Sequence, residues 1–181
     1  MKGTGVAYSK GPEWAEPKCL QDWPELVGSA LANKVRTQVG YDASGRARTW
    51  GLLCDGDDNS ITIKEYFKLY LDPAHRDNYP DRPSVREAKR YFKDYMTFLF
   101  THIDNFFRNS HPRWDEEKVE YLFSIPTTWK NPSQSAEIER LINEAGFGGG
   151  SALRRVKIAQ TEAEAAAVYA AKGHFKVSLS R

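Results

Sequence analysis

The sequence predicts an α/β fold, and the order of elements in its second half carries that prediction. A long helix pattern over 85–109 is followed by a strand at 119–125, a helix at 133–145, a strand at 153–160 and a further helix after Thr161. Strands that alternate with helices usually pair in parallel through right-handed crossovers. We therefore expect one α/β domain with a parallel strand pair near its end.

Composition limits the chain to one domain, or to one lobe of a larger domain. It has 181 residues and a net charge of +2, from 26 Lys and Arg against 24 Asp and Glu. No block of like charge stands out, so we expect neither a nucleic-acid nor a membrane partner.

Cys19 and Cys54 form neither a metal-ligand pair nor a disulfide framework. The lack of a secretory signal and of a long apolar run predicts a cytoplasmic protein, with the nucleus as an alternative.

The first half of the chain predicts short strands and irregular segments. Residues 4–8 are expected to form a strand, and the proline-containing segment 11–33 an irregular cover over apolar surface. Residues 35–41 and 48–54 are rich in strand formers, and the turn formers of 42–47 join them. This pattern predicts a β-hairpin.

Residues 61–71 predict a helix, because Ile63, Phe67 and Tyr70 or Leu71 recur at helical spacing. The acidic loop that precedes it, 55–60, lacks the glycine and the final glutamate of a calcium-binding loop. We therefore expect a solvated turn there.

The long helix over 85–109 begins with Ser84 as its N-cap and presents one broad apolar face. The residues of this face are Val85, Ala88, Phe92, Tyr95, Met96, Leu99, Ile103, Phe106 and Phe107. So wide an aromatic stripe is typical of a core.

The strand at 119–125 alternates apolar and polar residues, and Leu122 suggests that its other face is buried too. The helix at 133–145 is expected to end at Gly146. The glycine-rich stretch 146–151 runs from a helix to a strand, whereas phosphate-binding loops run from a strand to a helix, so a connector is the better interpretation.

Familiar catalytic motifs are absent from the sequence. It has neither a P-loop nor a dinucleotide fingerprint. The four histidines lack metal-ligand spacing. Ser124 and Thr127 have no evident partner base, which leaves no basis for a nucleophile there.

The stretch VKIAQTEAEAAAVYAA places an acid just after the last strand. Thr161 is suited to cap the following helix, with Glu162 in its first turn. One interpretation is that Glu162 only stabilises the helix start. The other is functional, because open α/β sheets place their sites at the carboxyl ends of strands.

Three stretches together resemble the nucleotide-binding domain of the seventy-kilodalton heat-shock (DnaK-like) family of the actin-like ATPase superfamily. They are YLFSIPTTW at 121–129, SAEIERLINEAGF at 135–147 and IAQTEAEAAAVYAA at 158–171. The Thr-Glu-Ala-Glu form of the third is similar to divergent fungal-type members. KVRTQVGY, TWG and YFKLYL resemble such members more weakly. The resemblance implies that residues 1–181 are a partial nucleotide-binding domain: a ribonuclease H-like first lobe, with a mixed sheet and flanking helices.

The resemblance also implies an ATP and Mg²⁺ site. Glu162 matches the family's glutamate that positions the hydrolytic water and the hydrated metal ion, which it would hold through water. Lys68, with Lys64 as an alternative, would stabilise charge on the transferred phosphate. Thr4 and Thr161 would contact the nucleotide.

The chain departs from the family pattern at both ends. The Asp-x-Gly-Thr-Thr loop expected before TGVAYS is missing, and so are the second phosphate loop and the second lobe. We therefore expect a lobe truncated at both ends, either a fragment or a degenerate member, with little or no ATP hydrolysis alone. Loss of the first strand also predicts that the aromatic face over 85–109 is incompletely covered.

Two other functions stay open on the sequence alone. One is a non-catalytic interaction scaffold for a protein partner or client, whose exposed anchors would come from the tryptophans Trp14, Trp23, Trp114 and Trp129. The other is a different actin-like ATPase, such as a sugar kinase. The Thr-Glu-Ala-Glu-Ala segment favours the DnaK-like branch over the sugar kinases.

Overall fold

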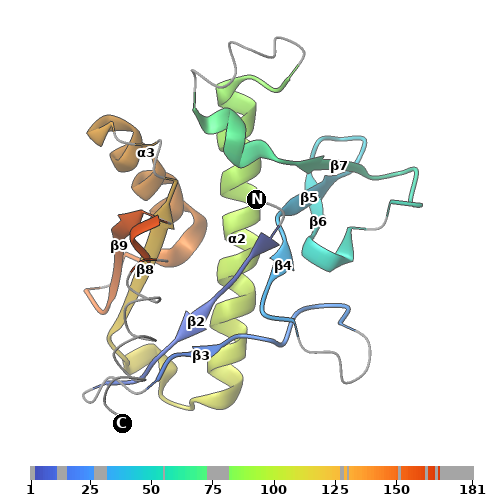
Figure 1. The fold of residues 1–181 in the computed structure, drawn as a ribbon. Helices are drawn as coiled ribbons and strands as arrows, with labels where there is room; N and C mark the ends of the chain where they lie inside the picture. The colour runs from blue at the N-terminus through green and yellow to red at the C-terminus, as the bar shows by residue number, and fades with distance from the viewer. Residues whose placement is uncertain are drawn as a thin grey trace, which may run out of the picture. The chain divides into compact units, whose positions relative to one another are not determined.

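A computed structural model describes residues 3–11, 16–26, 32–54, 56–72, 82–126, 129, 131–150, 152–161, 163–165 and 167. These residues have a mixed α/β structure (Figure 1). The chain divides into two compact units, Met1–Phe98 and Leu99–Arg181.

The described strands form four small sheets and not the mixed sheet that the family resemblance implies. Many of them are too short to extend a sheet. β1 (Gly3–Thr4) pairs with β4 (Val35–Arg36), and β2 (Ala7–Tyr8) pairs with β3 (Lys18–Cys19), both antiparallel. The strand expected at 4–8 is therefore split into β1 and β2.

A three-stranded antiparallel sheet forms the centre of the first unit, and it confirms the expected hairpin. β5 (Gln38–Tyr41) lies between β6 (Ala47–Trp50) and β7 (Thr62–Glu65). The strand predicted over 48–54 ends early, because Gly51 adopts a positive φ of 57° and begins the 3-10 turn η1 (Gly51–Leu53).

The helix predicted over 61–71 is wrong. The segment forms β7 and then the short 3-10 helix η2 (Phe67–Leu71), and Tyr66 between them has a φ of 57°. The β-branched residues Ile61, Thr62 and Ile63 favour a strand, and pairing with β5 outweighs the helical spacing of the apolar residues. The acidic turn before β7 is exposed, as expected, and the Asp58 carboxylate accepts a bond from the Ser60 amide at 2.9 Å.

Helix α2 (Val85–Ser110) begins as the sequence predicts. The Ser84 hydroxyl accepts the Glu87 amide at 3.2 Å, while the Glu87 carboxylate accepts both the amide and the hydroxyl of Ser84, at 2.9 and 2.7 Å. This reciprocal capping box satisfies donors at the helix start. The residues predicted for its apolar face are buried, except for Val85 and Phe106, which are half-buried.

The second unit contains the expected parallel pair. β8 (Val119–Ile125) and β9 (Arg154–Thr161) run parallel, and α3 (Pro132–Ile142) lies between them in the sequence (Figure 1). Leu122 has 56% of its surface exposed, so its predicted burial is wrong. The outward-facing residues of β8 are exposed, and no described element covers that face at Leu122.

The core of the second unit centres on Phe147. Its ring contacts those of Phe100, Tyr121 and Phe123, with centroids 5.0–5.1 Å apart. Phe147 ends the π-helical turn η4 (Asn143–Phe147), which continues α3 beyond the predicted helix. Gly146 has a φ of 118°, and a Cβ there would lie 2.5 Å from the Phe100 ring, so glycine is required.

Candidate functional site

The ends of β8 and β9 lie side by side. Their register pairs Ile125 with Thr161, the last residue of each strand. Parallel strands of α/β proteins place their ligands at this carboxyl edge. Beyond β8, Pro126 accepts a backbone bond from the buried Trp129 at 3.0 Å, which turns the chain at the edge.

A β-bulge interrupts the register just before this edge. Phe123 pairs with Ile158, but the next residue, Ser124, pairs with Gln160, so Ala159 is the extra residue of β9. Bulges bend a strand and redirect the side chains that follow, and they are frequent beside functional sites. The bulge here precedes Thr161 by two residues.

Thr161 caps the helical residues that follow it, as the sequence predicts. Its hydroxyl accepts the Glu164 amide at 3.2 Å and donates to the Glu164 carboxylate at 2.9 Å, while its amide donates to that carboxylate at 2.7 Å. These bonds from the amide and hydroxyl of Thr161 lower the pKa of Glu164. Glu164 is therefore the acid that closes the capping box. It stands three residues after the cap, yet it was not among the predicted site residues.

Glu162 lies outside the described residues. The interpretation of Glu162 as an acid that stabilises the helix start is compatible with the functional one, and it stays a prediction. The functional interpretation of Glu162 stays a prediction.

The helix that follows β8 in the sequence, α3, has a side-chain cap. Asn131 caps α3, and its side-chain oxygen accepts the Ser133 amide at 3.0 Å and the Ser133 hydroxyl at 2.8 Å. The chain that leaves β8 thus leads to a capped helix start. Helix starts present N–H donors and partial positive charge, an environment that favours anions such as phosphate.

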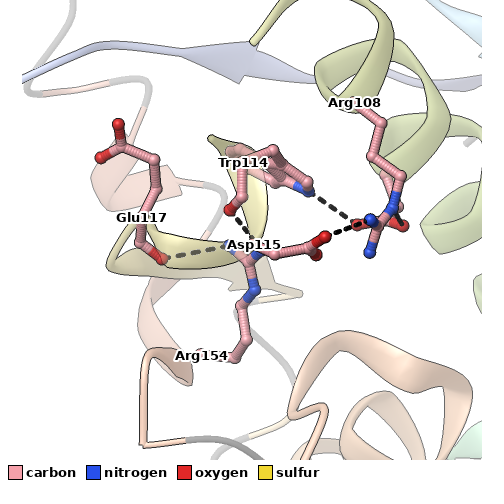
Figure 2. A network of polar contacts seen from close by, with 6 residues as sticks. Arg108, Trp114, Asp115, Glu117 and Arg154 are labelled. Atoms are coloured by element: carbon pink, nitrogen blue, oxygen red, sulfur yellow. Dashed lines mark hydrogen bonds and ion pairs between the residues drawn. The ribbon is translucent and has the colours of Figure 1, made fainter. Parts of the chain in front are cut away.

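The opposite, amino end of the strand pair is held by Arg154 (Figure 2). Its guanidinium donates to the backbone oxygen of Trp114 at 2.9 Å and to that of Glu117 at 3.5 Å, and it lies 4.4 Å from the Trp114 ring centroid. The Glu117 carboxylate points away from Arg154 in the same view. Arg154 thereby ties the first residue of β9 to the turn that leads into β8.

Trp114 and Arg108 extend these contacts to α2. The Trp114 indole donates to Asp104 at 2.7 Å, and its ring stacks on Phe107 with centroids 4.6 Å apart. Arg108 bonds both Asp104 and Asp115 at 2.6 Å, which lowers the pKa of Asp115 (Figure 2). These contacts fix the amino end of the strand pair and leave the carboxyl edge for other roles.

Thr4 belongs to the first unit, in a group of hydroxyls around Tyr95. The Thr4 and Thr37 hydroxyls are 2.9 Å apart. Burial raises the pKa of Tyr95 to about 12, and the nearby Thr4 and Thr37 hydroxyls oppose that rise. The Tyr95 hydroxyl is buried without a hydrogen bond of good geometry among the described residues. Neither Thr37 nor Tyr95 stood out in the sequence as polar members of a site.

The two candidate lysines also belong to the first unit. Lys68 lies half-buried on η2, and Lys64 lies half-buried on β7 with its ammonium 5.9 Å from the Tyr91 ring centroid. No hydrogen bond joins Thr4 to Lys68 among the described contacts. The assignment of either lysine to phosphate stays a prediction.

The expectation of exposed tryptophan anchors is wrong for three of the four residues. Trp23, Trp114 and Trp129 expose only 2%, 7% and 4% of their surfaces, because each packs into a core. Trp14 lies outside the described residues. Trp14 is therefore the one candidate anchor of the four that these burial values do not exclude, and the scaffold alternative stays a prediction.

Neither a direct metal site nor a membrane span occurs in the part of the chain that the structure describes. No three His, Cys, Asp or Glu side chains there converge to hold an ion. None of the described helices is both long and apolar enough to cross a membrane.

Searches against protein-family models, curated proteins and solved structures find no match to this chain.

Proposed function

We propose that this chain is the first lobe of a DnaK-like, actin-type ATPase domain, and that the carboxyl edge of β8 and β9 binds the phosphates of ATP. The observation that supports the proposal is the register that pairs Ile125 with Thr161. It brings the two segments that carry the strongest family resemblance to one edge. The residue after Thr161 is Glu162, the acid that the resemblance assigns to catalysis.

The chemistry of this edge suits a nucleotide with its metal ion. The carboxylate of Glu162 is a hard oxygen ligand of the kind that Mg²⁺ accepts. Mg²⁺ usually keeps several waters and is shared with substrate phosphates, so one nearby carboxylate acting through water is enough. The absence of an acidic cluster among the described residues is compatible with this mode of binding.

The role proposed for Glu162 is to orient a water molecule for attack on the terminal phosphate. Thr161 would hold the start of the helix in place. When bound, Mg²⁺ supplies charge that neutralises the phosphate oxygens.

Thermal unfolding with and without millimolar Mg-ATP tests the proposal. A ligand at about 100 times its Kd stabilises a fold by roughly 2.7 kcal/mol, which raises the melting temperature by several degrees. We expect that rise for the wild-type chain, and a changed rise for Glu162→Gln. Glu117→Gln is the matched control, since its exposed carboxylate lies at the other end of the strand pair.

The proposal fails if a cooperatively folded chain shows no shift with Mg-ATP. It also fails if Glu162→Gln and Glu117→Gln respond to Mg-ATP identically to the wild type, because nucleotide would then bind elsewhere.

A further inference from the structure

β8 is an edge strand of the second unit. Among the described strands it pairs only with β9, so no described strand lies along its other edge. The backbone N–H and C=O groups of such an edge form a template on which a further strand can pair. We call this side of β8 the open edge.

The backbone groups of the open edge belong to three exposed residues. The Val119 amide donates to the Leu153 oxygen at 2.8 Å, so the backbone groups of Val119 face β9. In a parallel pair the residues of one strand face the partner strand alternately, which turns the groups of Glu120, Leu122 and Ser124 to the open edge. The side chains of these three residues are exposed, and Leu122 exposes 56% of its surface.

The outer edge of β9 is protected against pairing, whereas the open edge of β8 is not. β9 contains Arg154, Arg155 and Lys157, and the bulge at Ala159 interrupts it. Charged side chains and bulges are devices that prevent edge-to-edge association of sheets. β8, VEYLFSI, has no basic residue, and its one acid, Glu120, forms an ion pair with Lys157 at 2.5 Å.

The sequence of β8 is complementary to itself when two copies run antiparallel about Leu122. This residue lies at the centre of the strand, so it faces its own copy in the second chain. The other cross-strand pairs are Tyr121 with Phe123, Glu120 with Ser124, and Val119 with Ile125. Aromatic and β-branched pairs of this kind stabilise a sheet, and no two like charges lie opposite each other.

The same register also satisfies the backbone groups of the open edge. In an antiparallel ladder, hydrogen-bonded pairs alternate with pairs that form no hydrogen bonds. The hydrogen-bonded pairs must be those whose groups face the open edge. In this register they are Leu122 with Leu122 and Glu120 with Ser124. Side chains and backbone therefore agree on one alignment.

We propose that this chain forms a two-fold dimer in which β8 pairs antiparallel with β8 of a second copy. The two-stranded sheets of the two copies join in the order β9, β8, β8, β9, so the protected strands become the outer edges. Contact between identical surfaces about a two-fold axis closes the assembly at two chains. The exposed Leu122 side chains then lie next to each other on one face of the joined sheet. The dimer does not depend on nucleotide binding.

Sedimentation velocity over a wide range of protein concentrations tests the proposal. We expect a monomer–dimer equilibrium for the wild-type chain. Leu122→Lys should raise its dissociation constant at least about tenfold, because two lysines would then lie opposite each other. Leu122 is exposed, so the variant should fold, which thermal unfolding checks. Leu69→Lys is the matched control: Leu69 exposes 43% of its surface in the first unit, and this variant should dimerise like the wild type.

Cysteine cross-linking tests the register. Cys19 is exposed and Cys54 is buried, so Cys19→Ser removes the accessible thiol. In that background Leu122→Cys should give a disulfide-linked dimer, because directly opposite Cα atoms are about 5.5 Å apart. Glu120→Cys alone should not, because its two copies are offset by four residues, about 14 Å. A mixture of the Glu120→Cys and Ser124→Cys proteins should cross-link.

Any of four results would overturn the proposal. One is a wild-type chain that stays monomeric at every concentration. Another is an equal effect of Leu122→Lys and Leu69→Lys, whether both abolish the dimer or neither does. The third is growth beyond the dimer, which would mean that other edges pair. The fourth is cross-linking of Glu120→Cys alone that equals that of Leu122→Cys, which would mean a different register.

Discussion

Thr161 and Glu164 bond each other in both directions at the end of β9, with the Thr161 hydroxyl as acceptor of the Glu164 amide and donor to its carboxylate. This pair fixes where the strand ends and the helix begins. Glu162 stands between the two in the sequence. Substitutions of Thr161 therefore bear on the residue proposed as the catalytic acid.

Thr161→Ala is expected to destabilise the fold by about 1 kcal/mol, the usual cost of losing a threonine cap. It should also weaken the effect of Mg-ATP on the melting temperature, because the helix start frays. Thr161→Ser keeps the hydroxyl and should restore both properties. Thermal unfolding of the two variants, with and without Mg-ATP, measures both the stability and the effect of Mg-ATP on the melting temperature. Equal stability of Thr161→Ala and Thr161→Ser would show that the capping bonds contribute nothing.

The two capping boxes predict a loss of stability in acid. The pKa of Glu87 is lowered by bonds from the hydroxyl and amide of Ser84, and that of Glu164 by bonds from the amide and hydroxyl of Thr161. A carboxyl group whose pKa is lowered by folding stabilises the fold at pH values above its unfolded-state pKa, which is about 4.3 for Glu. This stabilisation is lost as the pH falls through the pKa of the folded state.

The stability advantage of the wild type over Glu87→Gln should consequently be largest at neutral pH and shrink below about pH 4.3. Thermal unfolding of both proteins across this pH range checks the sign. Glu117→Gln is the control, because the exposed Glu117 side chain caps no helix. If the wild type stays more stable than Glu87→Gln by the same amount down to low pH, the capping role of the Glu87 carboxylate is contradicted.

Arg154 is expected to stabilise the second unit far more than its neighbour Arg155. Arg154→Ala removes two hydrogen bonds to backbone oxygens and a contact with the Trp114 ring, a loss of about 1–2 kcal/mol. Arg155 is exposed, so Arg155→Ala should change stability by less than about 0.5 kcal/mol. Denaturant unfolding of the two variants distinguishes them, and equal losses would show that the contacts of Arg154 are not important.

The fold was predictable where local and tertiary preferences agree. The second unit shows this agreement: an alternating strand, a helix ended by a glycine and an apolar strand give the parallel pair that was expected. The segment 61–71 shows the opposite, because its apolar spacing suggests a helix whereas its β-branched residues pair with β5. Only tertiary pairing decides such a case. The burial of Leu122 was mispredicted because sequence does not reveal which face of a strand is covered.

The candidate site was predictable only in part. Thr161 as a helix cap follows from its position between a strand and an alanine-rich segment, and the structure confirms it. The approach of Thr4 to Thr37 and Tyr95 depends on pairing between distant strands, which no local pattern reveals.

Equilibrium binding of a fluorescent ATP analogue, measured with Mg²⁺ and with the metal chelated, tests the central claim most directly. The account predicts saturable, metal-dependent binding that ATP displaces, a clearly changed affinity for Glu162→Gln, and wild-type affinity for Glu117→Gln. Phosphate release under the same conditions should be slow or undetectable. Absence of saturable binding by the folded wild-type chain, or identical affinities for the three proteins, would contradict a nucleotide site at the carboxyl edge of β8 and β9.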